Sequence, residues 1–278
     1  MSLLDRLRAV LKPSWSDRFP APERPWTPEY TASHEQLVRA ALDDASLCRA
    51  IAGSGRLPAG YGRGFDERVI EFPWVFGKRL EGRVLDAGST LNHEHILDRA
   101  LGQATELTIT TLAPETHAFP SRGISYVFGD LRELPFRDDW FDTTLSLSTL
   151  EHVGMANTVY GVDDPRSEDP DAEVARAAAE LRRVTRAGGR ILLTVPFGAP
   201  EDHGWFRQFD QPALERLVEA FGADQQTTAI FAYGRDGWKR SAPDQAAGLN
   251  YRDAHADPSA APDLAAAARA VACVSLRV

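Results

Sequence analysis

The stretch FGDLRELPFRDDWFDTTLSLSTLEHV, residues 128–153, decides the fold expected for this chain of 278 residues. One apolar run ends just before Asp130, and a second apolar run at 143–147 is followed closely by Glu151 and His152. Short apolar runs separated by helical patterns form right-handed βαβ units. The stretch therefore predicts two strands of a parallel sheet, each with polar side chains at its carboxyl end.

The same alternation continues on both sides of this stretch. The expected strands are 83–86, 107–111, 124–127, 143–147, 190–195, 227–231 and 272–277. The expected helices between them are 93–101, 172–186 and 211–221. This order predicts an α/β fold with a Rossmann-like, mostly parallel sheet of seven strands. Ligands of such sheets bind beyond the carboxyl ends of the strands, where the strand order reverses.

The first 65 residues are expected to form an N-terminal helical extension, followed by the sheet domain at 66–278. Its expected parts are a short helix at 1–12, an extended proline-rich segment at 13–30, a helix at 34–51 and a glycine-rich loop at 53–64. The first helix either docks on the domain or lies on a membrane surface. The loop, with Tyr61 and Arg63, either closes over a ligand as a lid or covers a sheet edge.

Composition excludes several classes of protein. The chain has 31 Lys and Arg residues against 40 Asp and Glu residues, a net charge of −9, which argues against a nucleic-acid partner. Two cysteines cannot build a disulfide framework or a four-sulfur zinc site. No apolar run reaches the roughly 20 residues of a membrane span, and no signal peptide opens the chain. We therefore expect a cytoplasmic enzyme without integral membrane contact.

The turn after the first expected strand, in RVLDAGSTLNHEH at 83–95, indicates the class of ligand. A dinucleotide pyrophosphate favours G-x-G-x-x-G, but only Gly88 is present here. The turn suits a ligand that carries a small carboxylate and a cation instead. His93 and His95 are two residues apart and point in different directions on a helix, so no metal site is expected.

The chain resembles class I S-adenosylmethionine-dependent methyltransferases. The stretch quoted first is similar to their GD-x-x-x-LPF-x-DD-x-FD pattern, and ELRRVTRAGGRILLTVPFG at 180–198 is similar to their LRRV-x-x-x-GGR segment. The resemblance covers about residues 66–278 and implies that the last strand runs antiparallel. From Trp74 to Gly198 the chain also looks like a bacterial subgroup linked to sugar or surface-polysaccharide biosynthesis.

The resemblance implies a role for individual residues in holding the cofactor S-adenosylmethionine. Asp86 and the Gly88 turn would line its methionine and sulfonium end. Asp130 would accept a hydrogen bond from the adenine amino group, and the Leu131 N–H would face a nitrogen of the adenine ring. The expected cofactor-binding residues are Asp86, Gly88, Ser89, Thr90, Thr111, Asp130, Leu131, Ser146 and Ser148. Thr111 departs from the family, which usually places an acid there for the ribose hydroxyls. Glu115 either swings in to replace it or starts a helix.

A hydroxyl acceptor needs a base, and imidazole titrates near neutral pH. His152 is the first candidate for the catalytic base, with Glu151 either acting as base or orienting His152. His203, in an aromatic loop after the fifth strand, is the second candidate. The alternative for each histidine is a packed structural role.

The sequence thus predicts a methyltransferase acting on a small-molecule or glycan acceptor, by O- or N-methylation. A non-catalytic binding or scaffold protein of the same fold is one alternative. A nicotinamide-dependent oxidoreductase is the other. Acceptor identity and oligomeric state do not follow from the sequence.

Overall fold

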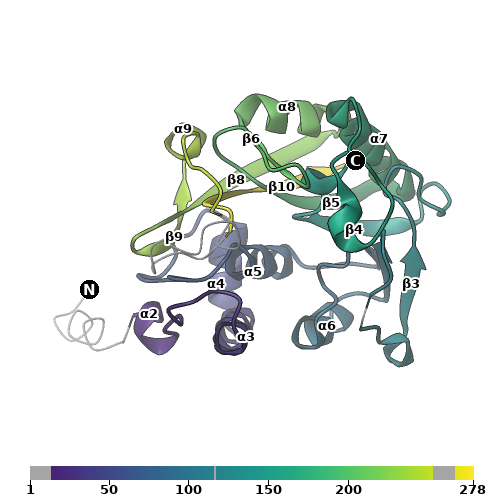
Figure 1. The fold of residues 1–278 in the computed structure, drawn as a ribbon. Coiled ribbons are helices and arrows are strands. Elements are labelled where there is room, and N and C mark those ends of the chain that lie inside the picture. The colour runs from purple at the N-terminus through teal and green to yellow at the C-terminus, as the bar shows by residue number, and fades with distance from the viewer. Residues whose placement is uncertain (1–13, 116, 253–266) are drawn as a thin grey trace.

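The computed structural model describes residues 14–115, 117–252 and 267–278, and the expected helix at 1–12 lies outside these ranges (Figure 1). The main sheet has eight strands in the order β3-β2-β1-β4-β5-β10-β8-β9. They are β1 (Arg83–Ala87), β2 (Glu106–Thr111), β3 (Ile124–Phe128), β4 (Phe141–Leu147), β5 (Thr185–Pro196), β8 (Gln225–Gly234), β9 (Gly237–Ser241) and β10 (Ala270–Arg277). This confirms the predicted Rossmann-like α/β fold.

The pairing directions of the strands also agree with the expectation. Strands β3, β2, β1, β4 and β5 are parallel neighbours, and β10 pairs antiparallel with both β5 and β8. Strand β1 pairs with β2 on one side and with β4 on the other. The strand order therefore reverses between β1 and β4.

The prediction of seven strands was wrong, because the described sheet has an eighth strand, β9. Strand β9 forms an antiparallel hairpin with β8. Its sequence GWKRS includes two adjacent cations and carries no apolar run, so periodicity did not indicate a strand. Two short strands, β6 (Glu201–Asp202) and β7 (Arg207–Gln208), pair separately in the loop after β5.

Helices cover both faces of the sheet (Figure 1). The long ones among the described residues are α3 (Pro28–Asp43), α4 (Ala45–Ala52), α5 (Arg68–Lys78), α6 (Glu94–Leu101), α7 (Pro170–Val184) and α8 (Gln211–Ala220). The short ones are α2 (Trp15–Arg18), α9 (Pro243–Ala246), η1 (Pro120–Arg122), η2 (Leu150–His152) and η3 (Asn157–Tyr160). No described helix combines the length and the apolarity that crossing a membrane requires.

The N-terminal segment departs from the sequence prediction in two places. The stretch expected to be extended contains α2 and the first turns of α3, which begins at Pro28 with Thr27 as its N-cap. A proline at the first helical position costs no hydrogen bond, so it opens a helix readily. The single helix expected at 34–51 is two helices, because the Asp44 side chain accepts hydrogen bonds from the backbone N–H groups of Ser46 and Leu47 and caps α4.

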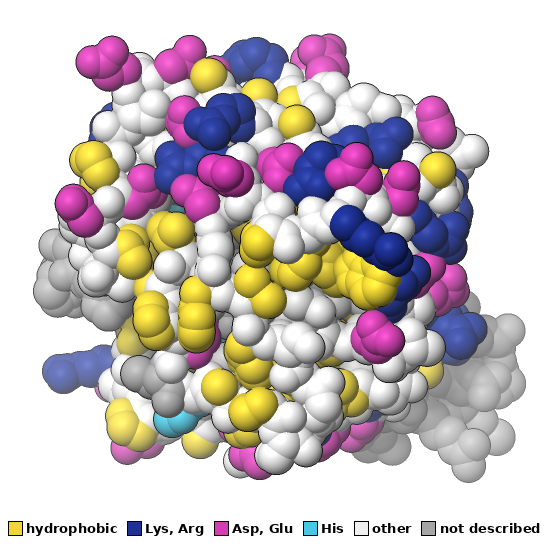
Figure 2. Space-filling view, turned by 90° about the vertical axis from the view of Figure 1, so that its right-hand side faces the viewer, with side chains coloured by type: hydrophobic (Ala, Val, Ile, Leu, Met, Phe, Trp, Pro, Cys, Tyr) yellow, Lys and Arg dark blue, Asp and Glu magenta, His cyan; other side chains and the backbone are white. Residues whose placement is uncertain are grey.

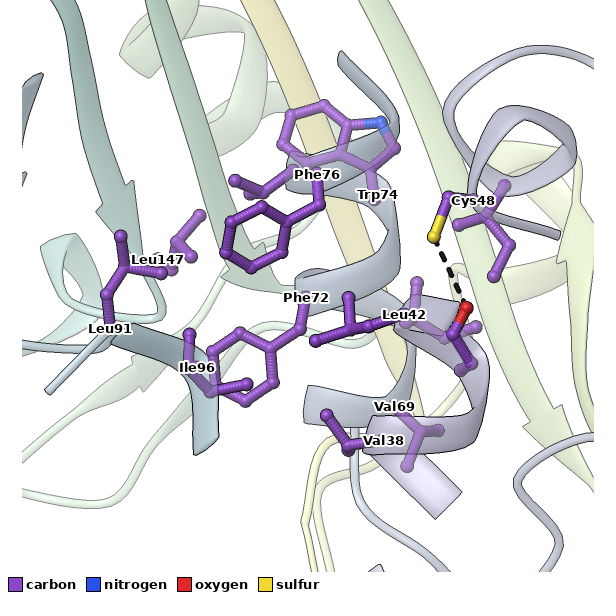
Figure 3. Packing of buried hydrophobic residues seen from close by; sticks show 14 of the residues in the cluster. Val38, Leu42, Cys48, Val69, Phe72, Trp74, Phe76, Leu91, Ile96 and Leu147 are labelled. Carbon is purple, nitrogen blue, oxygen red and sulfur yellow. Dashed lines mark hydrogen bonds between the residues drawn. The ribbon is translucent and has the colours of Figure 1, made fainter. Parts of the chain in front are cut away.

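The N-terminal helices share a hydrophobic core with the sheet (Figure 3). Phe72, Trp74 and Phe76 of α5 are buried at its centre. The labelled residues packed around them are Val38, Leu42, Cys48, Val69, Leu91, Ile96 and Leu147. Helix α5 is thereby fixed beside the carboxyl end of β4, which decides the position of the polar residues in its first turn.

Candidate functional site

A cavity of about 490 Å³ lies beyond the carboxyl ends of β1, β2, β3 and β4. Its volume is in the range of small-molecule binding sites. The predicted cofactor residues that line it are Gly88, Ser89, Thr90, Thr111, Asp130, Leu131 and Ser148, and His152 lines it as well. The structure therefore gathers residues that follow four different strands at the place where the strand order reverses.

The turn after β1 has a backbone that only glycine fits. Gly88 has φ +125°, and a Cβ there would lie 2.1 Å from Thr149 Oγ1. Its N–H donates to the carbonyl of Thr110 at 2.9 Å, which ties the turn to β2. Ser89 follows with φ +61°, a strained value for a residue with a side chain. The missing side chain of Gly88 lets the turn lie close against Thr149, at the start of the segment after β4.

Asp86 and Ser146 lie inside their strands and do not line the cavity, so the structure does not bring them to the position predicted for them. Asp86 is fully buried, and its Oδ2 accepts a hydrogen bond from the Leu91 N–H at 2.7 Å. This bond ties the loop after β1 back to the strand. Burial raises the pKa of Asp86 to about 7. Its Oδ1 and the Ser146 hydroxyl are buried without a hydrogen-bond partner.

The carboxyl end of β2 lacks the acidic residue that the resemblance leads us to expect as a partner for the ribose hydroxyls. Thr111 lines the cavity, but its hydroxyl donates to the carbonyl of Ala113 at 3.1 Å. Glu115 also lines the cavity, and the described residues around it form no helix, so the expectation that it starts one was wrong. Glu115 thus supplies a carboxylate to this side of the cavity from the loop instead of the strand.

Asp130 is held by an arginine that sequence reasoning missed. The Arg132 guanidinium donates to Asp130 Oδ1 at 2.9 Å and to Asp130 Oδ2 at 2.6 Å. It also donates to Asp164 at 2.8 Å and to Glu173 at 3.1 Å. Burial alone would raise the pKa of Asp130, but the hydrogen bonds from Arg132 outweigh it and lower the pKa. This network fixes the loop after β4 above the cavity.

His152 is the one predicted catalytic residue that the structure brings to the cavity. Its Nδ1 lies 3.0 Å from the carbonyl of Trp205. Because a carbonyl only accepts, Nδ1 carries the proton and Nε2 keeps its lone pair. The ring stacks on Trp205 at 5.2 Å and meets the edge of Tyr160 at 5.6 Å. Burial lowers the pKa of His152 to about 4, so the imidazole is neutral at physiological pH.

Glu151 and His203 lie outside the cavity lining. Glu151 is buried, its Oε2 has no partner, and burial raises the pKa of this carboxyl well above its ordinary value. His203 stacks on Phe206 with ring centres 4.4 Å apart, and its Nε2 is 3.7 Å from Glu201 Oε2. These contacts agree with the alternative that His203 has a packed, structural role.

Sequence reasoning also missed polar residues from α5 and from the loop after β4. Arg68 lines the cavity and pairs with the buried Glu71 at 2.5 Å. Two acids and an arginine within one turn of an otherwise apolar helix, in DERVIEFPW at 66–74, were the available signal. Asn157, Tyr160 and Asp164, which belong to the segment after β4, also line the cavity.

Apolar side chains remain exposed where the cavity opens. Leu112 and Tyr160 both line it and are 37% and 45% exposed. Figure 2 views the molecule from the side of β3 and α7, where hydrophobic side chains lie below a band of mixed acidic and basic ones. Among the described residues, no group of three or more His, Cys, Asp or Glu residues is placed to hold a metal ion.

Comparison with known proteins supports the assignment of this region. Residues 85–193 match the family model described as a methyltransferase domain. This range contains the last three residues of β1, all of β2 to β4 and most of β5. No curated protein matches the chain.

Solved structures similar to the chain include methyltransferases. The 1,6-didemethyltoxoflavin-N1-methyltransferase of Burkholderia thailandensis, with bound S-adenosylhomocysteine, is 16% identical, with 100% of this chain and 92% of that chain covered and a TM-score of 0.48. A possible histamine N-methyltransferase of Thermotoga maritima is 15% identical, with coverages of 71% and 82% and a TM-score of 0.42. The [4+2]-cyclase SpnF is 16% identical, with coverages of 88% and 95% and a TM-score of 0.45.

Proposed function

We propose that this chain is an S-adenosylmethionine-dependent methyltransferase that methylates a hydroxyl group of a small-molecule acceptor, since residues 85–193 match the family model described as a methyltransferase domain. The observation that carries the proposal is the cavity beyond β1 to β4, in which the Gly88 turn, Asp130 and His152 face one space. A site of about 490 Å³ has the size of a small-molecule binding site, which favours a small acceptor over a polymer.

The residues of the cavity fit a sulfonium nucleoside better than a dinucleotide. Glu115, Asp130 and Asp164 line it together with Arg68 and Arg132, so the charged side chains of the lining sum to one negative charge, which favours a cation. The turn after β1 has one glycine where a pyrophosphate favours three. We assign the adenine end to Asp130 and Leu131, the ribose to the side of Thr111 and Glu115, and the amino-acid end to the Gly88 turn.

S-adenosylmethionine, when bound, supplies the methyl group as an electrophile. His152 would then accept the proton of the acceptor hydroxyl on Nε2, while the Trp205 carbonyl holds Nδ1–H and fixes the ring orientation. Tyr160, against the ring of His152, would cover the acceptor and exclude water. Positioning of the hydroxyl in line with the methyl group supplies most of the rate enhancement.

Replacing His152 with alanine is expected to lower kcat by about 100-fold or more, because the proton acceptor and one wall of the acceptor site are lost. The Kd for S-adenosylhomocysteine should stay within about twofold, since the cofactor contacts remain. The rate should not fall with pH down to about pH 5, because the pKa of about 4 keeps Nε2 unprotonated above it. The acceptor for this assay comes from a screen of small alcohols, phenols, amines and sugars for release of S-adenosylhomocysteine.

The matched control for this substitution is His203→Ala. His203 packs on Phe206 away from the cavity, so kcat should be close to wild type. A His152→Ala variant with wild-type kcat, or a His203→Ala variant with the large loss, would contradict the proposed base. A screen in which only amines turn over would contradict the hydroxyl group as the methyl acceptor.

Calorimetry with two nucleotides tests the function itself. Wild type should bind S-adenosylhomocysteine and show no heat with NADH, and Asp130→Ala should bind S-adenosylhomocysteine about tenfold more weakly through loss of one charge-assisted hydrogen bond. Binding of NADH alone would support the oxidoreductase alternative. Binding of neither would support the non-catalytic alternative.

A further inference from the structure

Arg68 is a cation of the cavity that lies outside the residues matched by the methyltransferase-domain model. It is the first residue of α5, and its side chain is 29% exposed. It shares the lining with Gly88 and Ser89 of the turn after β1 and with Ser148 after β4. Glu71 contacts both Arg68 and the Ser148 hydroxyl, and the next residue, Thr149, lies against Gly88, so the guanidinium lies toward the glycine-turn end of the cavity.

The Arg68 guanidinium has more N–H donors than it has acceptors among the described residues. An arginine side chain carries five N–H donors in a planar fork that matches a carboxylate. Among the described residues, the acceptor that Arg68 has for its side chain is Glu71, reached from Nη1 at 2.5 Å. Its neighbour Glu67 adds little negative charge, because burial raises the pKa of the Glu67 carboxyl to about 8. Arg68 is balanced by Glu71 and still presents unfilled N–H donors to the cavity.

Glu71 holds Arg68 in place from a fully buried position. Besides Arg68 it accepts hydrogen bonds from the Ser148 hydroxyl at 2.6 Å and the Thr194 hydroxyl at 2.5 Å. Ser148 has φ +42°, a strained value, and the bond to Glu71 helps to hold it there. Helix α5 and the ends of β4 and β5 are thus joined through one carboxylate, and Arg68 sits on a rigid support.

We propose that Arg68 is the carboxylate anchor of the cavity and that Glu71 is its positioning residue. The proposal rests on the proposed function, which places an amino-acid end at the Gly88 turn. The carboxylate of that amino-acid end is the first source of the ligand group. A carboxylate on the methyl acceptor is the second source.

A pair of nucleosides separates the amino-acid end from the rest of the cofactor. S-adenosylhomocysteine carries the carboxylate, and 5′-methylthioadenosine has the same adenine, ribose and thioether without it. Arg68→Ala should weaken S-adenosylhomocysteine at least about tenfold in calorimetry and leave 5′-methylthioadenosine within about twofold. Arg68→Lys should recover part of the lost affinity, since it keeps the charge and loses the fork.

Glu71→Gln tests the positioning role with the same two ligands. It keeps the shape of the side chain but weakens the support of Arg68, so the ratio of the two affinities should fall between wild type and Arg68→Ala. A purely structural role would weaken both nucleosides alike. Arg39→Ala is the matched control, because Arg39 forms an exposed pair with Glu35 on α3 and should change neither affinity.

The second source is tested with benzoate in the presence of saturating S-adenosylhomocysteine. If Arg68→Ala spares S-adenosylhomocysteine, benzoate should raise the Tm of wild type and not of Arg68→Ala, and the anchor then serves the acceptor. The proposal is overturned if Arg68→Ala and Arg68→Lys match wild type with all three probes. If wild type binds neither nucleoside, the proposed function fails first, which is a distinct result.

Discussion

Gly88→Ala is expected to weaken S-adenosylhomocysteine binding by about 100-fold or more, because the turn to which we assign the amino-acid end of the nucleoside has no room for a methyl group. The new Cβ would lie 2.1 Å from Thr149 Oγ1 and 2.6 Å from its Cγ2, and the backbone φ of +125° adds strain. Either the turn or the segment after β4 must then move into or away from the cavity. Calorimetry with S-adenosylhomocysteine measures the loss.

The matched control is Gly123→Ala. Gly123 has φ +77°, so it carries the same kind of backbone penalty, of about 1 kcal/mol, but nothing lies within 4 Å of a Cβ there. Gly123→Ala should therefore lose a little stability and no affinity. Equal affinities for the two variants would show that the Gly88 turn does not shape the cofactor site.

Glu71→Ala is expected to lower the free energy of unfolding by about 3–5 kcal/mol, the usual cost of removing one partner from a buried ion pair. The substitution leaves Arg68 without its acceptor and removes the group that receives the Ser148 and Thr194 hydroxyls. The stability loss is expected in the absence of any ligand. Urea denaturation followed by circular dichroism measures it.

Glu35→Ala supplies the control for this prediction. Glu35 pairs with Arg39 in a helical i,i+4 arrangement on the surface of α3, and such pairs contribute about 0.5 kcal/mol or less. The two carboxylates differ in burial, not in charge. A Glu71→Ala variant as stable as Glu35→Ala would mean that the buried network does not stabilise the junction of α5 with the sheet.

The fold could be predicted from the sequence wherever local apolar runs coincide with strands. Strands β1 to β5, β8 and β10 bury apolar side chains and were visible as such runs. Strand β9 was not, because its place in the sheet comes from pairing with β8, and its Lys239 and Arg240 hide the pattern. The helices before residue 30 were hidden by prolines, which open helices as readily as they stop them.

The candidate site could be predicted where residues directly follow a strand. Gly88, Asp130, Ser148 and His152 were found this way, because the carboxyl ends of parallel strands meet at one edge. Asp86 and Ser146 each lie one residue before the end of their strand, so their side chains are buried between the sheet and the helices that cover it. They miss the cavity because its lining begins with the residue that follows each of these strands, Gly88 and Ser148.

The Arg68–Glu71 pair illustrates what a sequence alone cannot place. Glu71 and Thr194 are 123 positions apart and meet because α5 packs against β4 and β5 through its aromatic face. No local spacing encodes that contact. The arginine clamp on Asp130 has the same origin, since Arg132 reaches Asp164 and Glu173 across the loop after β4.

A crystal structure of the chain with S-adenosylhomocysteine tests the central claim most directly. The account predicts density for the nucleoside beyond β1 to β4, with the adenine beside Asp130 and Leu131, the ribose toward Thr111 and Glu115, and the amino-acid carboxylate toward Gly88. Density elsewhere, such as in the groove between α8 and the β8–β9 hairpin, or a reversed nucleoside with its adenine at Gly88, would contradict it.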